Sequence, residues 1–330
     1  METLLKNTNA YKLLRTECSD GRFGHAYLLH FDDGRNLKKA LTTFAKLFFI
    51  GEQNFSRIEK LIDEGSFSDC LYYPDEDKKL TVEDAENIRE ESLLSPLEGN
   101  KKLFLLGDFA EANAQTQNKL LKLLEEPPEG VIFLLSATTV FPILTTVLSR
   151  TKKLEIQPFS PEEVTACLNR IYGEKYDRQT LALCAAASNG NVGEAQNILE
   201  GGYFKTLSES AFSLVLCEES KLPTAVKNVG ETKHKKQLLS LLRLIFRDGI
   251  LLKMQKQTGI NNESLLLLKS EKEQLLEVAE KYELSTLLYA QEEISNAEKQ
   301  VQFNAVFPQC IGLCMANIRK NNKQAKQKEI

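Results

Sequence analysis

The sequence predicts an α/β domain with a largely parallel sheet, followed by an all-helical part. The runs AYLLHF (26–31), KLFLL (102–106) and VIFLLSA (131–137) are almost continuously apolar, which is typical of strands buried on both faces. Segments with helical spacing at 37–49 and 112–125 separate them, and this alternation favours a parallel sheet. Beyond about residue 158 only helical patterns remain.

Each strand and helix of the first part has its own local reason. The three apolar runs are short and lie in the length range of strands. The helix predicted within 112–125 must stop at Pro127 and Pro128, because proline has no N–H to donate and restricts the residue before it. The expected order is therefore strand, helix, strand, helix, strand.

The later part begins with a strong helix start. Ser160 is the predicted N-cap, Pro161 occupies the first helical position and Glu163 completes a capping box. A small helical unit then runs to about Gly201 and Gly202. Two later sets of apolar residues recur at helical spacing: Leu238, Leu241, Leu242, Ile245 and Leu252, and Leu275, Val278, Ala279, Tyr282 and Leu287. The stretch from Arg319 has no apolar face and is expected to be solvated or disordered.

Composition limits the class of protein. A chain of 330 residues with 42% apolar and 27% charged residues is expected to form two or three globular domains. The net charge of −4 gives no general attraction to a polyanion. No apolar run approaches the roughly 20 residues that span a bilayer, and the first residues lack the layout of a signal peptide. A cytoplasmic protein without a membrane anchor is expected.

The cysteines predict neither disulfides nor a metal site. Seven cysteines without a C-x-x-C pair are expected to be reduced thiols. Cys310 and Cys314 lie four residues apart on a predicted helix, but two ligands without a neighbouring histidine make a poor zinc site. The three histidines and the absence of a nucleophile motif offer no catalytic triad. We therefore expect no metal and no cofactor.

Four stretches carry a resemblance to a known family. Residues 25–50, HAYLLHFDDGRNLKKALTTFAKLFFI, align without a gap to a strand, phosphate loop and first helix. QNKLLKLLEEPP (117–128) is the most specific motif, VIFLLSATT (131–139) follows it, and TTVLSRTKKLEIQPFSPEE (145–163) completes the series. In this order and spacing the chain resembles the clamp-loader family of AAA+ proteins. The resemblance implies a AAA+ domain over 1–158, a helical lid over 159–203, a helical collar over 204–318 and a basic tail over 319–330.

The resemblance also shows what this chain has lost. The GKT positions of the phosphate loop are Asn36, Leu37 and Lys38, and Gly34 is the one cradle glycine that remains. A phosphate loop needs glycines, a lysine and a hydroxyl for magnesium, so Leu37 cannot replace the family's residue. The acidic pair of the Walker B strand falls on Gly107 and Asp108. Gly193 occupies the place of the sensor-2 arginine. The sequence therefore predicts a degenerate ATP site, and residues 51–69 lack the cysteines of the family's zinc module.

One motif remains intact. Ser149 and Arg150 match the family's SRC motif, with Thr151 in place of its cysteine. In the family this arginine reaches the γ-phosphate of ATP on a neighbouring subunit, so Arg150 is the predicted arginine finger and Ser149 its companion. An arginine paired with a local carboxylate is the alternative role. Lys152 and Lys153 lie beside it and are expected either to support phosphate contacts or to be solvated.

A retained finger beside a lost ATP site is typical of the delta-prime subunits of bacterial DNA polymerase III. The resemblance implies no intrinsic enzyme activity, with tau/gamma ATPase subunits, a delta subunit, the sliding clamp and, through the complex, primed DNA as partners. A delta-like clamp-loader subunit and an active AAA+ ATPase with an unusual phosphate loop remain alternatives. A degenerate AAA+ scaffold in another assembly is the remaining one.

Overall fold

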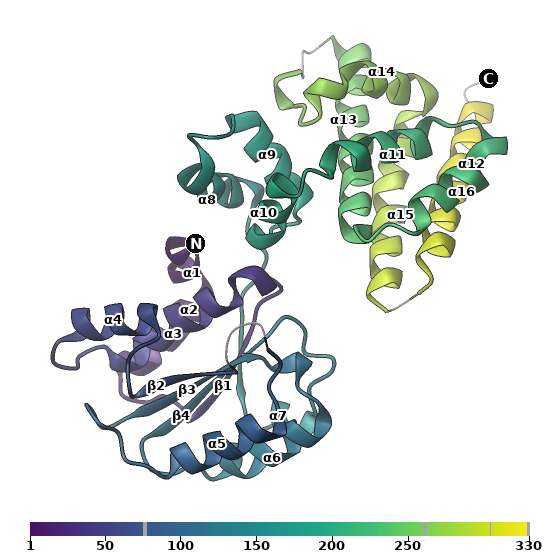
Figure 1. The fold of residues 1–330 in the computed structure, drawn as a ribbon. Helices are drawn as coiled ribbons and strands as arrows, with labels where there is room; N and C mark the ends of the chain where they lie inside the picture. The colour runs from purple at the N-terminus through teal and green to yellow at the C-terminus, as the bar shows by residue number, and fades with distance from the viewer. Residues whose placement is uncertain (75–77, 260–262, 304, 329–330) are drawn as a thin grey trace. The chain divides into compact units, whose positions relative to one another are not determined.

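The computed structural model describes residues 1–74, 78–259, 263–303 and 305–328, and the chain divides into two units (Figure 1). The first unit comprises Met1–Phe159 together with Asn191–Gly193, and the second comprises Ser160–Gly190 and Glu194–Ile330. The finer predicted division at about residue 203 stays a prediction.

A five-stranded sheet forms the centre of the first unit (Figure 1). Its strands are β1 (Ala26–His30), β2 (Cys70–Tyr73), β3 (Lys102–Asp108), β4 (Val131–Ala137) and β5 (Lys152–Glu155). Their order is β2-β3-β4-β1-β5, and all four neighbouring pairs are parallel. The predicted α/β class with a parallel sheet is confirmed, and the three predicted strands are β1, β3 and β4.

Helices cover both faces of this sheet (Figure 1). The α-helices of the first unit are α1 (Glu2–Asn7), α2 (Asn9–Ser19), α3 (Leu37–Ala45), α4 (Phe55–Glu64), α5 (Val82–Ser92), α6 (Ala114–Glu125) and α7 (Thr145–Leu148). Short 3-10 turns are η1 (Gly34–Asn36), η2 (Lys46–Phe49) and η3 (Phe109–Glu111). In Figure 1, α3 and α4 lie on one side of the strands and α5 and α6 on the other. The segment without the family's zinc module forms α4.

Alternate strand residues build the core beneath α5 and α6. Phe104 of β3 and Phe133 of β4 stack with ring centroids 5.4 Å apart. Ile88 of α5 and Leu120 of α6 belong to the same fully buried cluster. Truncating a buried phenylalanine of this kind to alanine costs about 3 to 5 kcal/mol. The sheet is therefore a rigid base for the loops that leave its carboxyl edge.

The second unit consists of helices and their connecting loops, with no strand among its described residues. Its α-helices are α8 (Pro161–Tyr172), α9 (Arg178–Ala187), α10 (Val192–Glu200), α11 (Phe204–Leu216), α12 (Leu222–Gly230), α13 (Lys235–Thr258), α14 (Lys272–Lys281), α15 (Leu284–Gln302) and α16 (Phe307–Lys328). The first two residues of α10 belong to the first unit. Short 3-10 turns are η4 (Glu219–Lys221), η5 (Glu263–Leu265) and η6 (Lys269–Glu271). The long helix α13 packs against α15, and α15 packs against α16.

The predicted capping box at the start of α8 is present. Glu163 N–H donates to Ser160 Oγ over 3.2 Å, and Ser160 N–H donates to Glu163 Oε2 over 2.9 Å. Pro161 follows at the first helical position. Two backbone donors at the helix start are thus satisfied reciprocally, which fixes the position where α8 begins.

The expectation of a solvated or disordered tail from Arg319 is wrong in part: the described residues are helical, although most of residues 323–327 are exposed. Helix α16 continues to Lys328, and Arg319 and Asn322 are buried. Arg319 Nη2 donates to the Leu214 carbonyl over 3.0 Å, and Asn322 Nδ2 donates to the Lys281 carbonyl over 3.0 Å. These polar side chains satisfy carbonyls near the ends of α11 and α14, a role that an apolar-face criterion does not detect. Residues 329–330 lie outside the described residues.

Candidate functional site

Arg150 is positioned by the short helix α7. Ser149 follows α7 as its C-cap, and Arg150 N–H donates to the Val147 carbonyl over 3.0 Å. Thr151 Oγ1 donates to the same carbonyl over 3.1 Å, so the replacement of the family's cysteine adds a hydrogen bond within this turn. Ser149 is exposed and its Oγ donates to the Thr146 carbonyl over 3.1 Å. The two predicted site residues therefore lie together on one surface turn.

The guanidinium of Arg150 is held on two sides. Its Nη2 lies 3.2 Å from Glu125 Oε2, and its Nη1 donates to the Thr146 carbonyl over 3.0 Å. A longer contact of 3.4 Å joins Nη1 to Ser149 Oγ. The side chain is 31% exposed, while Nε is buried with no hydrogen-bond partner among the described residues. Both the local ion pair considered from the sequence and a solvent-accessible guanidinium are thus present.

A buried amide fixes the loop that leads into α7. Gln117 of α6 is 1% exposed. Its Nε2 donates to the carbonyls of Ala112 and Pro142 over 2.9 and 3.2 Å, and its Oε1 accepts the Leu144 N–H over 2.9 Å. The side chain therefore joins α6 to both sides of the turn before Arg150. Sequence reasoning missed this role, although Gln117 opens the most specific motif.

The two neighbouring lysines are paired. Lys152 Nζ forms an ion pair with Glu17, and Lys153 Nζ lies 2.9 Å from Glu155 Oε2. Both lysine side chains are nearly half exposed. Each lysine therefore has a carboxylate partner within the chain, and both predicted roles stay predictions.

The loop between β1 and α3 carries apolar and acidic side chains. Phe31 is buried, and Leu37 begins α3 as a buried residue. Gly34 opens the 3-10 turn η1, and a Cβ built on it would lie 3.5 Å from Thr138 Cγ2, which is ordinary contact. No lysine stands at the position where a phosphate loop places one, and Lys39 pairs instead with Asp63 over 3.1 Å. The lysine that a phosphate loop supplies at this position is therefore replaced by an apolar side chain.

Asp33 fills the interior of this loop. The carboxylate is 1% exposed, and its Oδ1 accepts the Asn36 N–H over 3.1 Å. Its Oδ2 accepts the Asn36 Nδ2 over 2.9 Å and the Gly193 N–H over 2.8 Å. Burial is the main cause that raises the pKa of Asp33, and these hydrogen bonds oppose it. Asp33 was not predicted as a site residue.

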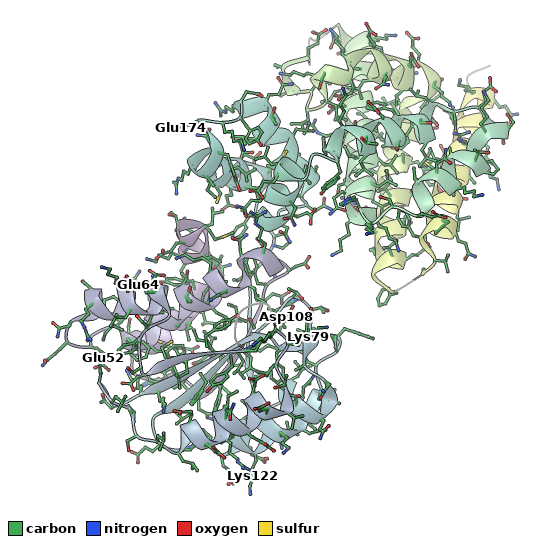
Figure 2. All side chains as sticks on the ribbon, viewed as in Figure 1. Glu52, Glu64, Lys79, Asp108, Lys122 and Glu174 are labelled. Atoms are coloured by element: carbon green, nitrogen blue, oxygen red, sulfur yellow. The ribbon has the colours of Figure 1, made fainter. Side chains whose placement is uncertain are left out.

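Gly107 and Asp108, at the Walker B positions, do not form an acidic pair, and Asp108 is used in hydrogen bonds within the fold. Gly107 lies beside Tyr72, and a Cβ built on Gly107 would be 3.0 Å from Tyr72 Oη. Asp108, labelled in Figure 2, accepts the Thr138 N–H and hydroxyl over 3.2 and 2.6 Å and the Ala110 N–H over 3.2 Å. Its carboxylate therefore fixes the end of β3 to the residue after β4.

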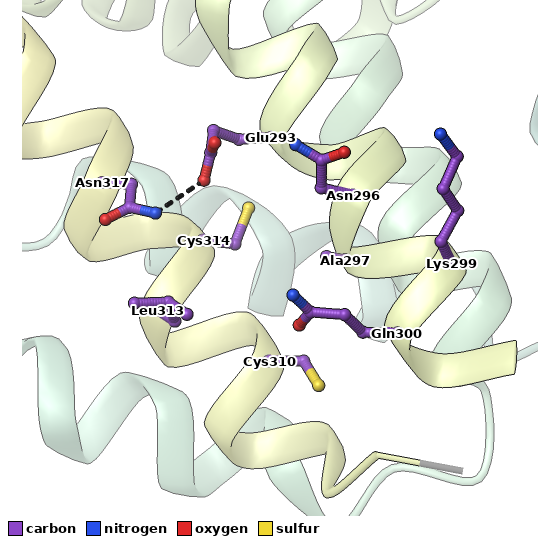
Figure 3. Close-up of a pocket in the computed structure, with 9 residues that line it drawn as sticks. All are labelled: Glu293, Asn296, Ala297, Lys299, Gln300, Cys310, Leu313, Cys314 and Asn317. Atoms are coloured by element: carbon purple, nitrogen blue, oxygen red, sulfur yellow. Dashed lines mark hydrogen bonds between the residues drawn. The ribbon is translucent and has the colours of Figure 1, made fainter. Parts of the chain in front are cut away.

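The described residues offer no other chemistry-bearing cluster. They contain no group of three or more His, Cys, Asp or Glu side chains arranged to hold a metal ion. Cys310 and Cys314 line a surface pocket with Glu293 between α15 and α16 (Figure 3). Burial raises the pKa of the Cys314 thiol to about 12, which makes it a weak nucleophile and a weak ligand. His25 Nε2 lies 3.0 Å from the Leu124 carbonyl, a packing role.

Within the part of the chain that the structure describes, no helix has the length and apolar content that crossing a bilayer requires.

Comparisons with known proteins give consistent matches. Residues 6–160 match a family described as DNA polymerase III, delta subunit. The delta-prime subunit of DNA polymerase III from Bacillus subtilis is 26% identical over 250 residues, which cover 72% of this chain and 75% of that protein. A DNA polymerase III gamma subunit from Buchnera aphidicola is 29% identical over 142 residues, covering 42% of this chain. The chain spans only 38% of that gamma subunit's length.

A solved structure also aligns along most of the chain. A DNA polymerase III gamma subunit-related protein from Thermotoga maritima gives a TM-score of 0.43 at 18% identity, covering 94% of this chain and 99% of that one.

Proposed function

From the premise that this chain is a AAA+ subunit of the clamp-loader type, we propose that it is a delta-prime-like member of a DNA polymerase III clamp loader that does not hydrolyse ATP. In this role it presents Arg150 to ATP held by a neighbouring tau/gamma-type subunit. The assembly, with a delta subunit, loads the sliding clamp onto primed DNA in the cytoplasm. The observation that carries the proposal is the accessible, ion-paired guanidinium of Arg150 in a chain whose own phosphate loop is filled by Asp33.

The chemistry asked of Arg150 is electrostatic. Negative charge shifts onto the equatorial and leaving oxygens as a γ-phosphoryl group is transferred, and a fixed guanidinium stabilises it through a bidentate fork. Arg150 already has one carboxylate, Glu125, at 3.2 Å. A phosphate oxygen from a neighbour can replace that carboxylate or add to it, because the side chain remains 31% exposed. The charge of the arginine therefore stays compensated before and after the subunits meet.

Three features support the absence of ATP hydrolysis by this chain. Leu37 is buried at the position of the family's lysine and has no charge or hydrogen-bonding group. Gly107 offers no carboxylate for magnesium, and Asp108 is bonded to Thr138 and Ala110. Magnesium and the β- and γ-phosphates would thus lack the lysine, the hydroxyl and one of the acids that hold them in active members.

A delta-like subunit is the second candidate, because the matched family is described by the name of that subunit. The two candidates make different demands on Arg150. A delta-prime-like chain needs the guanidinium for hydrolysis by its neighbour, whereas the alternative needs only the surface of the AAA+ domain.

The test is the ATPase rate of the loader reconstituted with clamp and primed DNA. Native chain, Arg150→Ala, Arg150→Lys and the control Lys153→Ala are compared, and each variant is assayed alone. We expect an inert isolated chain, a loss on the order of 10³ or more in the assembly with Arg150→Ala, and little recovery with lysine, which lacks the planar fork. Lys153→Ala removes an adjacent exposed charge and should leave the rate unchanged.

Gel filtration establishes that each variant still assembles. Hydrolysis by the chain alone would disprove the non-hydrolysing role. An assembled loader that retains its rate with Arg150→Ala would favour the delta-like candidate.

A further inference from the structure

We propose that the Asp33 carboxylate is a built-in substitute for a nucleotide phosphate, which orders the loop at 31–36 and the segment Asn191–Gly193 without any ligand and excludes phosphate from this place. This inference deepens the proposed non-hydrolysing role. Only one part of it, the exclusion of nucleotide from this loop, rests on that proposed function. The structural part, an internal anion joining two segments, stands on its own contacts.

Asp33 lies where parallel α/β sheets commonly bind an anionic ligand. It follows β1, a central strand of the sheet, and precedes α3 through the turn η1. Ligands of open parallel sheets bind at the carboxyl ends of the strands, and phosphates in particular bind at the start of the helix that follows. Here the carboxylate caps η1 by accepting the Asn36 N–H. The negative group thus comes from the chain itself.

The contacts of Asp33 are those of a bound oxyanion. Two backbone N–H groups from separate stretches of sequence, Asn36 and Gly193, converge on its two oxygens at 3.1 and 2.8 Å, and the Asn36 amide adds a third donor at 2.9 Å. Charge-assisted hydrogen bonds of this kind are about twice as strong as neutral ones. An isolated buried carboxylate would be very costly, so these donors are what make its burial possible.

A second polar contact joins the same two segments. The Asn191 side-chain amide donates to the Asp32 backbone carbonyl. Residues 191–193 belong to the first unit, so both contacts lie within one compact body. The segment is therefore held to the loop by an amide at one end and by the Asp33 carboxylate at the other.

Gly193 is the steric counterpart of Asp33. A Cβ built on Gly193 would lie 2.1 Å from Asp33 Oδ1 and 2.7 Å from Arg35 Cβ. No side chain fits there unless the carboxylate leaves, and this includes the arginine that the family carries at this position. The loss of the sensor-2 arginine and the presence of Asp33 are thus two halves of one arrangement. A free γ-phosphate and its arginine have been replaced by a carboxylate and a bare backbone N–H.

Gly193→Ala tests the proposal through the sign of the change in the free energy of unfolding. Gly193 lies in the first turn of α10. Alanine is a better helix former than glycine by about 1 kcal/mol in a helix interior, so an unconstrained position would gain stability or stay neutral. The proposal predicts the opposite, because the methyl group collides with Asp33. Gly312→Ala in α16 is the matched control, since its Cβ would meet Val226 at an ordinary 3.6 Å.

The main experiment is hydrogen exchange of backbone amides in the full chain. Native protein, Asp33→Ala and the control Asp32→Ala are compared, the control removing the exposed neighbouring acid. We expect Asp33→Ala to accelerate exchange in peptides covering both 34–37 and 191–195, on the order of tenfold or more, because two amides lose a charged acceptor. Sodium formate, a carboxylate that fits the vacated space, should restore protection, whereas sodium chloride at equal ionic strength should not.

The outcomes separate the inference from the proposed function. Unchanged exchange at 191–195 in Asp33→Ala, or equal acceleration in Asp32→Ala, overturns the inference. If Asp33→Ala does not fold, destabilisation by Gly193→Ala relative to Gly312→Ala decides in its favour, and stabilisation decides against it. A loader insensitive to Arg150→Ala would sink the proposed function while leaving the exchange result intact. Binding of ATP by the native chain, measured by equilibrium dialysis, would disprove the exclusion of phosphate.

Discussion

Arg150 Nη2 lies 3.2 Å from Glu125 Oε2, so the turn after α7 is tied to the end of α6 by one ion pair. Glu125 lies within the LLKLLEEPP motif as the last residue of α6, and its side chain is 56% exposed. An exposed pair of this kind contributes about 0 to 1 kcal/mol to stability. Its consequence is orientation, because the pair and the Thr146 carbonyl together hold the guanidinium in one direction.

Glu125→Gln should therefore separate stability from orientation. We expect the free energy of unfolding, measured by urea titration, to change by less than about 1 kcal/mol. The ATPase rate of the assembled loader should fall, but less than with Arg150→Ala, because the guanidinium remains and only its alignment is lost. Glu126→Gln changes the adjacent exposed acid and should alter neither quantity. Equal rates for the two variants would show that the ion pair has no orienting role.

Gln117→Leu should destabilise the first unit. The substitution keeps the volume but leaves the Ala112 and Pro142 carbonyls and the Leu144 N–H without their buried partner. A buried group left unsatisfied costs about 1 to 3 kcal/mol. Gln115→Leu, at an exposed position of the same helix, is the control. Urea titration measures the difference, and a null effect would mean that the loop before α7 is held by other contacts.

Gly107→Asp restores the acid that the family carries but should not restore a magnesium site. The added Cβ would lie 3.0 Å from Tyr72 Oη and 3.4 Å from Pro74 Cδ, so these neighbours must shift by a few tenths of an ångström before the carboxylate is accommodated. We expect a lower thermal unfolding temperature and no ATPase activity of the chain alone. A gain of magnesium-dependent hydrolysis would show that this single loss had inactivated the site.

Lys281→Met tests a cap on α11. Lys281 Nζ donates to the carbonyls of Val215, Leu216 and Cys217 over 3.1, 2.7 and 2.8 Å. A cation at a helix C-terminus satisfies carbonyls that have no intrahelical donor. Removing it should lower the free energy of unfolding by about 1 to 3 kcal/mol. Lys320→Met, which removes an exposed lysine, should change it little.

The burial of Cys70 should slow alkylation of its thiol in the native chain. Burial raises the pKa of the Cys70 thiol from 9.0 to about 12, so the thiol stays protonated until the pH approaches 12. Because the thiolate is the nucleophile, alkylation by iodoacetamide at pH 8 should be slower in the native chain than in urea by on the order of 10³. Mass spectrometry of the Cys70 peptide measures both rates. Comparable rates would show that the β2 edge opens readily.

The central strands were predicted well because a short, continuous apolar run is typical of a strand buried on both faces of a sheet. β1, β3 and β4 are buried on both faces and match the predicted ranges closely. The edge strands β2 and β5 were not predicted. β5 reads Lys-Lys-Leu-Glu and buries only Leu154, so its pairing with β1 depends on the neighbouring strand and not on its own pattern.

Residues of the candidate site could be predicted only where they belong to a recognisable sequence motif. Arg150 and Ser149 came from such a motif, and their neighbourhood in the structure agrees with a surface turn. Asp33, Gln117 and Glu125 act through contacts with residues 25 to 160 positions away. No local spacing encodes those contacts. The same reason explains the error at Arg319, whose acceptor belongs to a helix about a hundred residues earlier.

The placement of α16 also has a consequence for how the protein is made. Helix α16 packs against α12 and α15, and Arg319 reaches back to Leu214 of α11. On a ribosome the first unit has its strands complete by Glu155 and its remaining segment by Gly193, so it can fold while synthesis continues. The second unit cannot close until residues 307–328 have emerged. Until then the apolar faces of α12 and α15 remain exposed to whatever chaperones attend the nascent chain.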